Sequence, residues 1–163
     1  GSEKKGAAHA SPNLFEGATV LITPTPDTDP EVSDAIRRLW EALGAEVVEM
    51  TPELHDEIVA RTSHLPHIAA ALLVSNLRTL GPQHSRLVGR GFLDTTRVAS
   101  SDPEMWTEIC LENIEQIQEA LATLRADLDE FDLYLREGAY EKLFEFFRSV
   151  KNARDSLIRE TDG

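Results

Sequence analysis

The chain has 163 residues, of which 41% are hydrophobic, so one domain or a small domain plus part of another can build a core. Its formal net charge is -13 at pH 7. That balance argues against a nucleic-acid partner, which needs clustered lysine and arginine, and against binding to an anionic membrane.

The N-terminal part predicts a strand, a helix and a second strand. Residues 17–24 form a short β-branched run closed by prolines, which is typical of a buried strand. Asp29 and Pro30 predict the start of a helix, and Gly44 predicts its end. Residues 45–50 predict a second strand, in a parallel or mixed sheet. Because a sheet normally has about five strands, we expect this segment to be the end of a larger domain.

The sequence after Thr51 predicts helices. Thr51 and the proline after it predict the start of a helix over residues 52–80, in which Pro66 predicts a kink. Residues 81–102 are rich in glycine and polar side chains, and they predict a loop with at most a short helical turn.

A long helix is predicted from Pro103 to Gly138, with an acidic face opposite a continuous apolar stripe. The stripe consists of Trp106, Cys110, Ile114, Ile117, Leu121, Leu124, Leu128, Phe131 and Leu135. A last helix over residues 139–161 is expected to bury Leu143, Phe146, Phe147, Val150 and Leu157. Such helices either pack in a bundle within the chain or form a dimer interface.

The segment 55–67 contains three histidines and an aspartate. His64 and His67 lie three residues apart, so they share one face of a helix, and His55 and Asp56 precede them. A zinc site needs three or four converging ligands, and the usual helical motif spaces two histidines by four residues. A metal site and histidines that simply satisfy a buried helix both stay open at this point.

The segment 89–106 has the composition of an anion site. Glycine permits unusual backbone angles or the close approach of a ligand, and arginine suits bidentate binding of a carboxylate. A tryptophan there would either wall the site or begin the apolar stripe. The residues concerned are Gly89, Arg90, Gly91, Asp94, Arg97 and Trp106.

Taken together, four segments resemble the prephenate dehydrogenase family: GSEKKG (1–6), LFEGATVLITPTP (14–26), LGAEVVEMTPELHDEIVARTSHLPH (43–67) and GFLDTTRVASSDPEMWTEICLEN (91–113). The resemblance implies a Rossmann domain that binds NAD(P), followed by a helical domain that dimerises, with the site between them. We therefore expect a mainly α fold. Residues 1–51 would be a β-α-β remnant of the nucleotide-binding domain, and residues 52–163 an all-helical dimerisation and substrate-binding domain.

The resemblance also implies a reaction. In the family, prephenate passes a hydride to the nicotinamide, a histidine accepts the hydroxyl proton, and CO2 leaves to give 4-hydroxyphenylpyruvate for tyrosine biosynthesis. The alternatives are arogenate dehydrogenase of the same family, a metal-dependent hydrolase using His55, Asp56, His64 and His67, and a standalone helical dimerisation module.

The site residues follow from the matched motifs. Arg97, in DTTR, matches the arginine that pairs with a substrate carboxylate. His67, in SHLPH, matches a substrate-contacting histidine, and His64 lies beside it. The remaining matches are Asp94 and Trp106, which line the same pocket, Glu3, an acidic residue near the cleft, and Arg90, which replaces a common family glycine and would add a cation.

Two family features are missing from the sequence. The catalytic histidine of the family lies in a His-Pro-x-x-Gly-(Ser/Thr)-Glu motif, and this chain starts at that glycine. No G-x-G-x-x-G occurs either. We therefore expect no catalytic residue, no bound NAD or NADP, no metal and no activity in this chain alone.

Partners and location follow from the remaining features. We expect a small-molecule substrate and a homodimer through the helical domain. Cys110 is the only cysteine, so no disulfide forms within the chain, which suits a reducing compartment. No apolar run reaches the roughly 20 residues of a membrane span, and no signal peptide is evident. We therefore expect a soluble, cytoplasmic protein.

Overall fold

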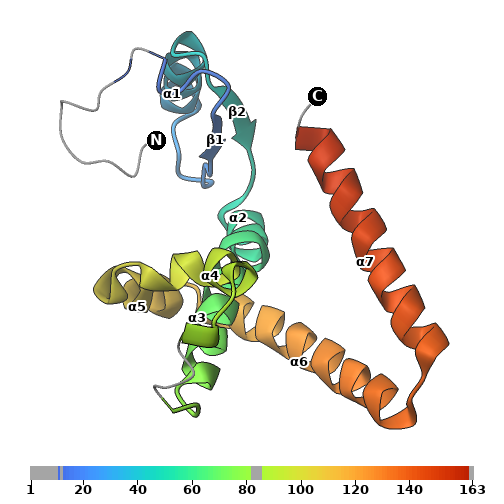
Figure 1. Ribbon diagram of the computed structural model, residues 1–163. Helices are drawn as coiled ribbons and strands as arrows, with labels where there is room; N and C mark the ends of the chain where they lie inside the picture. The colour runs from blue at the N-terminus through green and yellow to red at the C-terminus, as the bar shows by residue number, and fades with distance from the viewer. Residues whose placement is uncertain (1–10, 12, 82–85, 162–163) are drawn as a thin grey trace. The chain divides into compact units, whose positions relative to one another are not determined.

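The computed structural model describes residues 11, 13–81 and 86–161 (Figure 1). The chain divides into two compact units, Gly1–Ile117 and Gln118–Gly163. The mainly helical fold with a short β-α-β segment is confirmed. Glu3, one of the predicted site residues, lies outside the described residues. None of the described helices is long and apolar enough to cross a membrane.

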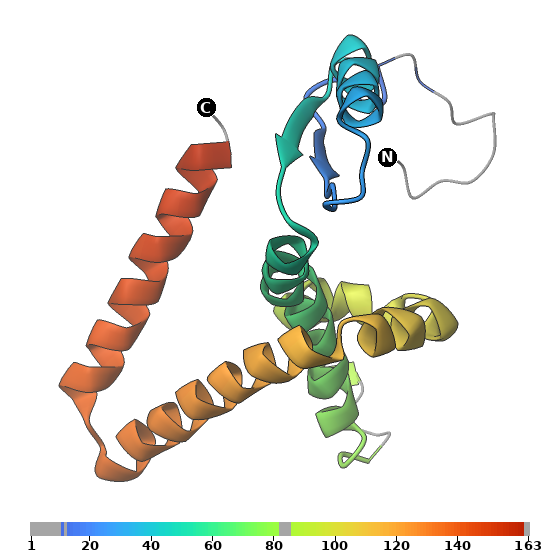
Figure 2. The same cartoon turned by 180° about the vertical axis from the view of Figure 1, so that it is seen from behind.

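The two strands of the first unit form a parallel pair. β1 (Thr19–Ile22) and β2 (Glu46–Glu49) lie in register, with Val20 opposite Val47. Figures 1 and 2 show α1 (Pro30–Ala42) beside this pair, and it contacts both strands. The predicted strand-helix-strand order and the parallel pairing are therefore confirmed.

The ends of α1 are set by the residues that the sequence indicated. Asp29 is the N-cap, and its Oδ1 accepts a hydrogen bond of 2.8 Å from the Glu31 N–H. Gly44 follows the helix with φ +84°, a left-handed conformation that glycine adopts without steric cost.

The predicted helix over 52–80 is a helix of three parts. α2 (Pro52–Val59) starts at Thr51, whose Oγ1 accepts from the Leu54 N–H at 3.2 Å. A π-helical segment, η2 (Ala60–His64), leads into α3 (Leu65–Leu77). In place of a sharp kink at Pro66, the helix has a widened turn just before this proline. Proline has no N–H to donate and its ring clashes with the carbonyl four residues earlier, so a regular α turn is disfavoured there. The helix ends at Leu77 rather than at residue 80.

The loop prediction for residues 81–102 is wrong over its second half. That half forms α4 (Arg90–Thr96) and a 3-10 turn, η4 (Arg97–Ser100), which both pack against α3. Tertiary packing therefore stabilises helices that the local composition disfavours. Gly89 and Gly91 have no left-handed backbone angles, so of the two roles left open for them only the close approach of a ligand remains a prediction.

The long helix predicted from residue 103 is interrupted. α5 (Pro103–Glu112) and α6 (Ile114–Glu137) meet at Asn113, whose φ of -127° and ψ of 44° are not helical. The Asn113 side chain is buried and bonds to the backbone of α2. Asparagine is a weak helix former, so a break at this residue costs little, and the bond to α2 holds the side chain in place at the break.

The second unit is a helical hairpin. α6 turns at Gly138, which has φ +61°, into α7 (Tyr140–Thr161), so both predicted boundaries are confirmed. The Phe131 ring meets those of Phe146 and Phe147 edge to face, at 5.3 and 5.9 Å between centroids. Beyond this cluster the two helices diverge (Figures 1 and 2).

The burial predicted for α7 is wrong within this chain. Phe147, Val150 and Leu157 are each more than half exposed, at 59%, 51% and 59%. Leu143 and Phe146 are only half-buried. The described residues of this unit therefore leave most of the apolar stripe of α7 uncovered.

Loss of the cap of α5 should weaken the first unit. The Asp102 Oδ1 accepts from the N–H groups of Glu104 and Met105, at 2.9 and 3.1 Å. Asp102→Ala should lower the free energy of unfolding by about 1 kcal/mol, measured by urea denaturation followed by circular dichroism. Asp102→Asn keeps an acceptor and should change it little. Equal losses in both variants would contradict this role.

Candidate functional site

Two histidines, His64 at the end of η2 and His67 on α3, meet one tryptophan of α5. The His67 ring stacks on the indole of Trp106, with 3.4 Å between centroids and 18° between planes. The His64 ring meets the same indole edge to face, at 6.1 Å and 86°. The i and i+3 spacing therefore puts both imidazoles against one side chain, and half-buried Trp106 packs against these two rings.

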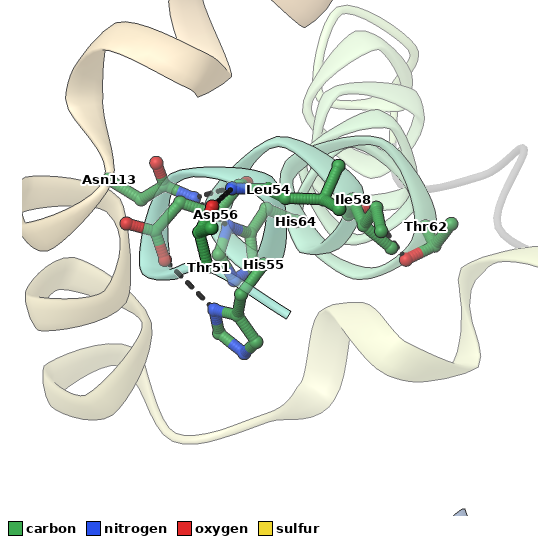
Figure 3. A network of polar contacts seen from close by, with 8 residues as sticks. All are labelled: Thr51, Leu54, His55, Asp56, Ile58, Thr62, His64 and Asn113. Carbon is green, nitrogen blue, oxygen red and sulfur yellow. Dashed lines mark hydrogen bonds and ion pairs between the residues drawn. The ribbon is translucent and has the colours of Figure 1, made fainter. Parts of the chain in front are cut away.

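A polar network extends from His64 to α2 (Figure 3). The His55 Nδ1 lies 2.9 Å from the Asp56 Oδ1. The Asn113 Nδ2 donates to the Asp56 carbonyl oxygen at 2.9 Å and lies 3.4 Å from the His64 Nδ1. These contacts join the consecutive segments α2 and η2 to the α5–α6 junction, which lies about 50 residues later in the chain.

The surroundings favour neutral imidazoles. Burial lowers the pKa of His64 and the charge of His55 lowers it further, while Asp56 acts in the opposite direction. Burial alone lowers the pKa of His67. Both rings are therefore uncharged at neutral pH, and each offers one hydrogen-bond donor and one acceptor.

A hollow of about 300 Å³ adjoins this network. Its size is in the range of a small-molecule site, and its wall combines apolar, hydroxyl, imidazole and carboxylate groups. The residues that line it are His55, Asp56, Val59, Ser63, His64, Ile109, Glu112 and Asn113. Of the predicted substrate residues, His64 lines this hollow.

The predicted anion-binding residues lie on the segment next to α3. Arg90 and Asp94 are on α4 and Arg97 begins η4, and all three side chains are exposed. Among the described residues, none of the three forms an ion pair. α4 and η4 both pack against α3, the helix that carries His67. The guanidinium groups of Arg90 and Arg97 therefore lie on segments next to that helix.

Sequence reasoning missed Asn113. The sequence signal for a helix break there is weak. It is one asparagine, a poor helix former, inside a predicted helix of otherwise regular apolar spacing. For the metal alternative, no three histidine, cysteine, aspartate or glutamate side chains of the described residues come together as a metal site. Nothing in that part of the chain supports the hydrolase reading.

The β-α-β segment does not fit the phosphates of a dinucleotide. The connection from β1 to α1, residues 23–29, contains no glycine that would let a pyrophosphate approach the backbone. At the N-terminus of α1 the Asp29 carboxylate already accepts the Glu31 N–H, so negative charge occupies the place of an anion.

The His67 imidazole should make stability depend on pH. Its pKa lies below 6.5 in the folded protein, so between that lowered value and 6.5 the unfolded chain binds more protons. The free energy of unfolding should therefore fall as the pH is lowered through this window. His67→Phe keeps a flat ring against Trp106 but cannot titrate, and urea titrations at several pH values should show a smaller fall. Identical slopes in both proteins would refute this assignment.

Two family models match the chain. Residues 51–149 match the dimerization domain of prephenate dehydrogenase, and residues 1–49 match its nucleotide-binding domain. The first of these matches alone covers more than half of the chain.

Individual relatives agree with the family models. A prephenate dehydrogenase of Bacillus subtilis is 38% identical over 160 residues, which are 96% of this chain and 43% of that protein. The structure of A. aeolicus prephenate dehydrogenase in complex with hydroxyphenyl propionate and NAD+ has a TM-score of 0.88 and 38% identity, over 96% of this chain and 56% of that one. Synechocystis arogenate dehydrogenase has a TM-score of 0.85 and 30% identity, over 96% and 58%. The chain thus spans about half the length of these relatives, and it belongs to the prephenate dehydrogenase family.

Proposed function

We propose that the protein to which this chain belongs catalyses the oxidative decarboxylation of prephenate to 4-hydroxyphenylpyruvate, with NAD as oxidant and NADP as the alternative. In this proposal residues 1–51 complete the nucleotide-binding domain and residues 52–163 bind substrate and dimerise. The supporting observation is that α3, which carries His67 and directly follows His64, packs against the segment that begins with Arg97.

The chemistry of the proposed site suits a carboxylic acid with a six-membered unsaturated ring. Prephenate is a dianion, and a chain of net charge -13 needs a local cation to hold it. Arg97 would pair with a carboxylate, and Arg90 would add a second cation nearby. The His67–Trp106 stack would form a flat wall for the ring, with His64 beside it and Asp94 on the opposing segment.

Arogenate is the second candidate substrate. An arogenate dehydrogenase is 30% identical over 96% of the chain, and this similarity supports arogenate as a candidate. Arogenate carries an amine where prephenate carries a keto group, so its oxidation product is tyrosine rather than 4-hydroxyphenylpyruvate.

A homodimer through α6 and α7 is part of the same proposal. The matched family model is that of a dimerization domain, and large apolar side chains of α7 are exposed in the single chain. Packing of this stripe against the same stripe of a second copy would bury the apolar side chains of both copies. The lone Cys110 fits a reducing compartment, so we also propose a cytoplasmic location.

Removal of the Arg97 guanidinium should weaken product binding. In a Trp40→Phe background, Trp106 is the only indole, and its fluorescence should report binding of 4-hydroxyphenylpyruvate. A hydrogen-bonded charge pair contributes roughly 1.5–3 kcal/mol, so Arg97→Ala should raise Kd roughly ten- to a hundredfold.

The matched control is Arg78→Ala, which removes an exposed arginine at the end of α3 and should leave Kd unchanged. An equal effect of both variants would mean that general charge, not the Arg97 site, governs binding. Tighter binding of tyrosine than of 4-hydroxyphenylpyruvate in the same titration would favour arogenate. No binding of either would favour a helical dimerisation module without a ligand.

A charge on the apolar stripe of α7 should dissociate the dimer. Val150→Glu would bury an unpaired carboxylate in the proposed interface, which is strongly unfavourable. Sedimentation velocity should show a dimer for the parent chain and a shift to monomer for this variant. Ser149→Glu adds the same charge one position away, rotated by about 100° around the helix, and should stay dimeric. A monomeric parent chain would contradict the proposed dimer.

A further inference from the structure

The one described side chain that joins the α5–α6 junction to both α2 and His64 is that of Asn113. It is buried, with 9% of its surface exposed. Its Nδ2 lies 2.9 Å from the Asp56 carbonyl oxygen and 3.4 Å from the His64 Nδ1. The same carbonyl accepts the N–H of Ala60, where α2 passes into the π-helical segment.

The orientation of this amide is fixed by chemistry. The Asp56 carbonyl oxygen can only accept a hydrogen bond, so the atom that faces it must be the Asn113 nitrogen and not its oxygen. A rotation of the amide by 180° would set two acceptors against each other in a buried place, which is costly. The amide has two N–H groups, and one of them is therefore left for the second neighbour, His64.

The same argument fixes the proton on the imidazole. Because the Asn113 Nδ2 can only donate, the His64 Nδ1 must be the acceptor and carry no proton. We propose that Asn113 is a positioning residue that holds His64 as the neutral tautomer with its proton on Nε2. The ring is then a hydrogen-bond donor, not a proton acceptor, toward a ligand in the adjoining hollow.

Two independent features agree with this assignment. Burial and the charge of His55 lower the pKa of His64, so the cation that would carry a proton on Nδ1 is disfavoured. The edge contact with Trp106 holds the plane of the ring at 86° to the indole, which limits its rotation. His64 lines the hollow of about 300 Å³. Because its Nδ1 already faces Asn113, the Nε2–H is the remaining polar group of the ring that can bind a ligand.

The consequence for binding rests on the proposed function. A neutral Nε2–H donor recognises an oxygen with a free lone pair, such as the carboxylate, carbonyl or hydroxyl oxygen of a cyclohexadienyl or phenolic acid. The His64 imidazole would thus help to orient the substrate and would not take the proton released on oxidation.

The test reads the two ring nitrogens of His64 directly. The full chain with 15N-labelled histidine is studied by long-range 1H–15N correlation NMR at neutral pH without ligand, and His64→Gln identifies the signals. In the parent chain, Nδ1 should show the shift of an unprotonated nitrogen and Nε2 that of a protonated one. Asn113→Asp replaces the donor by an acceptor, so the pattern should reverse or both nitrogens should become protonated. Asn113→Ala should move the two shifts toward each other.

A purely structural role for Asn113 predicts a different result. It would lower stability in both variants without reversing the nitrogen shifts, and such a result overturns the proposal. The control Asn76→Ala removes an exposed asparagine of α3 and should leave the His64 signals unchanged. If the Asn113 variants do not fold, the nitrogen shifts of the parent chain test the proposal. A proton on the His64 Nδ1 overturns it, and a proton on Nε2 alone supports it. The measurement needs no ligand, so it is independent of the titration that tests the proposed function.

Discussion

The hydrogen bond from the Asn113 carboxamide to the Asp56 carbonyl organises the helical part of the first unit. It lies where α5 ends and α6 begins, and it ties their junction to α2. The adjoining helix, α5, carries the Trp106 indole that packs against His64 and His67. The helix junction, the polar network and the ring contacts therefore meet in one place.

Much of the fold was predictable because its boundaries are set by local chemistry. Asp29, Thr51 and Asp102 cap helices with side-chain oxygens, and each is followed by a proline that suits the first turn. Gly44 and Gly138 end helices in left-handed conformations that other residues rarely adopt. Such signals act over three or four residues, so one sequence is enough to read them.

The parts that could not be predicted depend on distant contacts. α4 and η4 are short helices in a glycine-containing segment, and they are supported by packing on α3, which no local pattern announces. The break at Asn113 depends on a carbonyl 57 positions earlier in the chain. For the site, the spacing of His64 and His67 correctly predicted a shared face. The apolar spacing of α7 predicted burial, yet Phe147 and Val150 are more than half exposed, because periodicity marks an apolar face without identifying what packs on it.

The π-helical segment Ala60–His64 has a consequence for how this site tolerates changes in length. A π turn closes its hydrogen bond one residue later than an α turn, so it holds one residue more than a regular helix needs. Deleting one residue there would let this turn close as a regular α turn and would leave the helix after it in nearly the same place. A deletion within α2 would instead rotate everything after it by about 100°, and the two histidines would leave the indole and the hollow together. The π turn thus makes the geometry of the site tolerant of a one-residue deletion at this point, in contrast to the regular helical turns beside it.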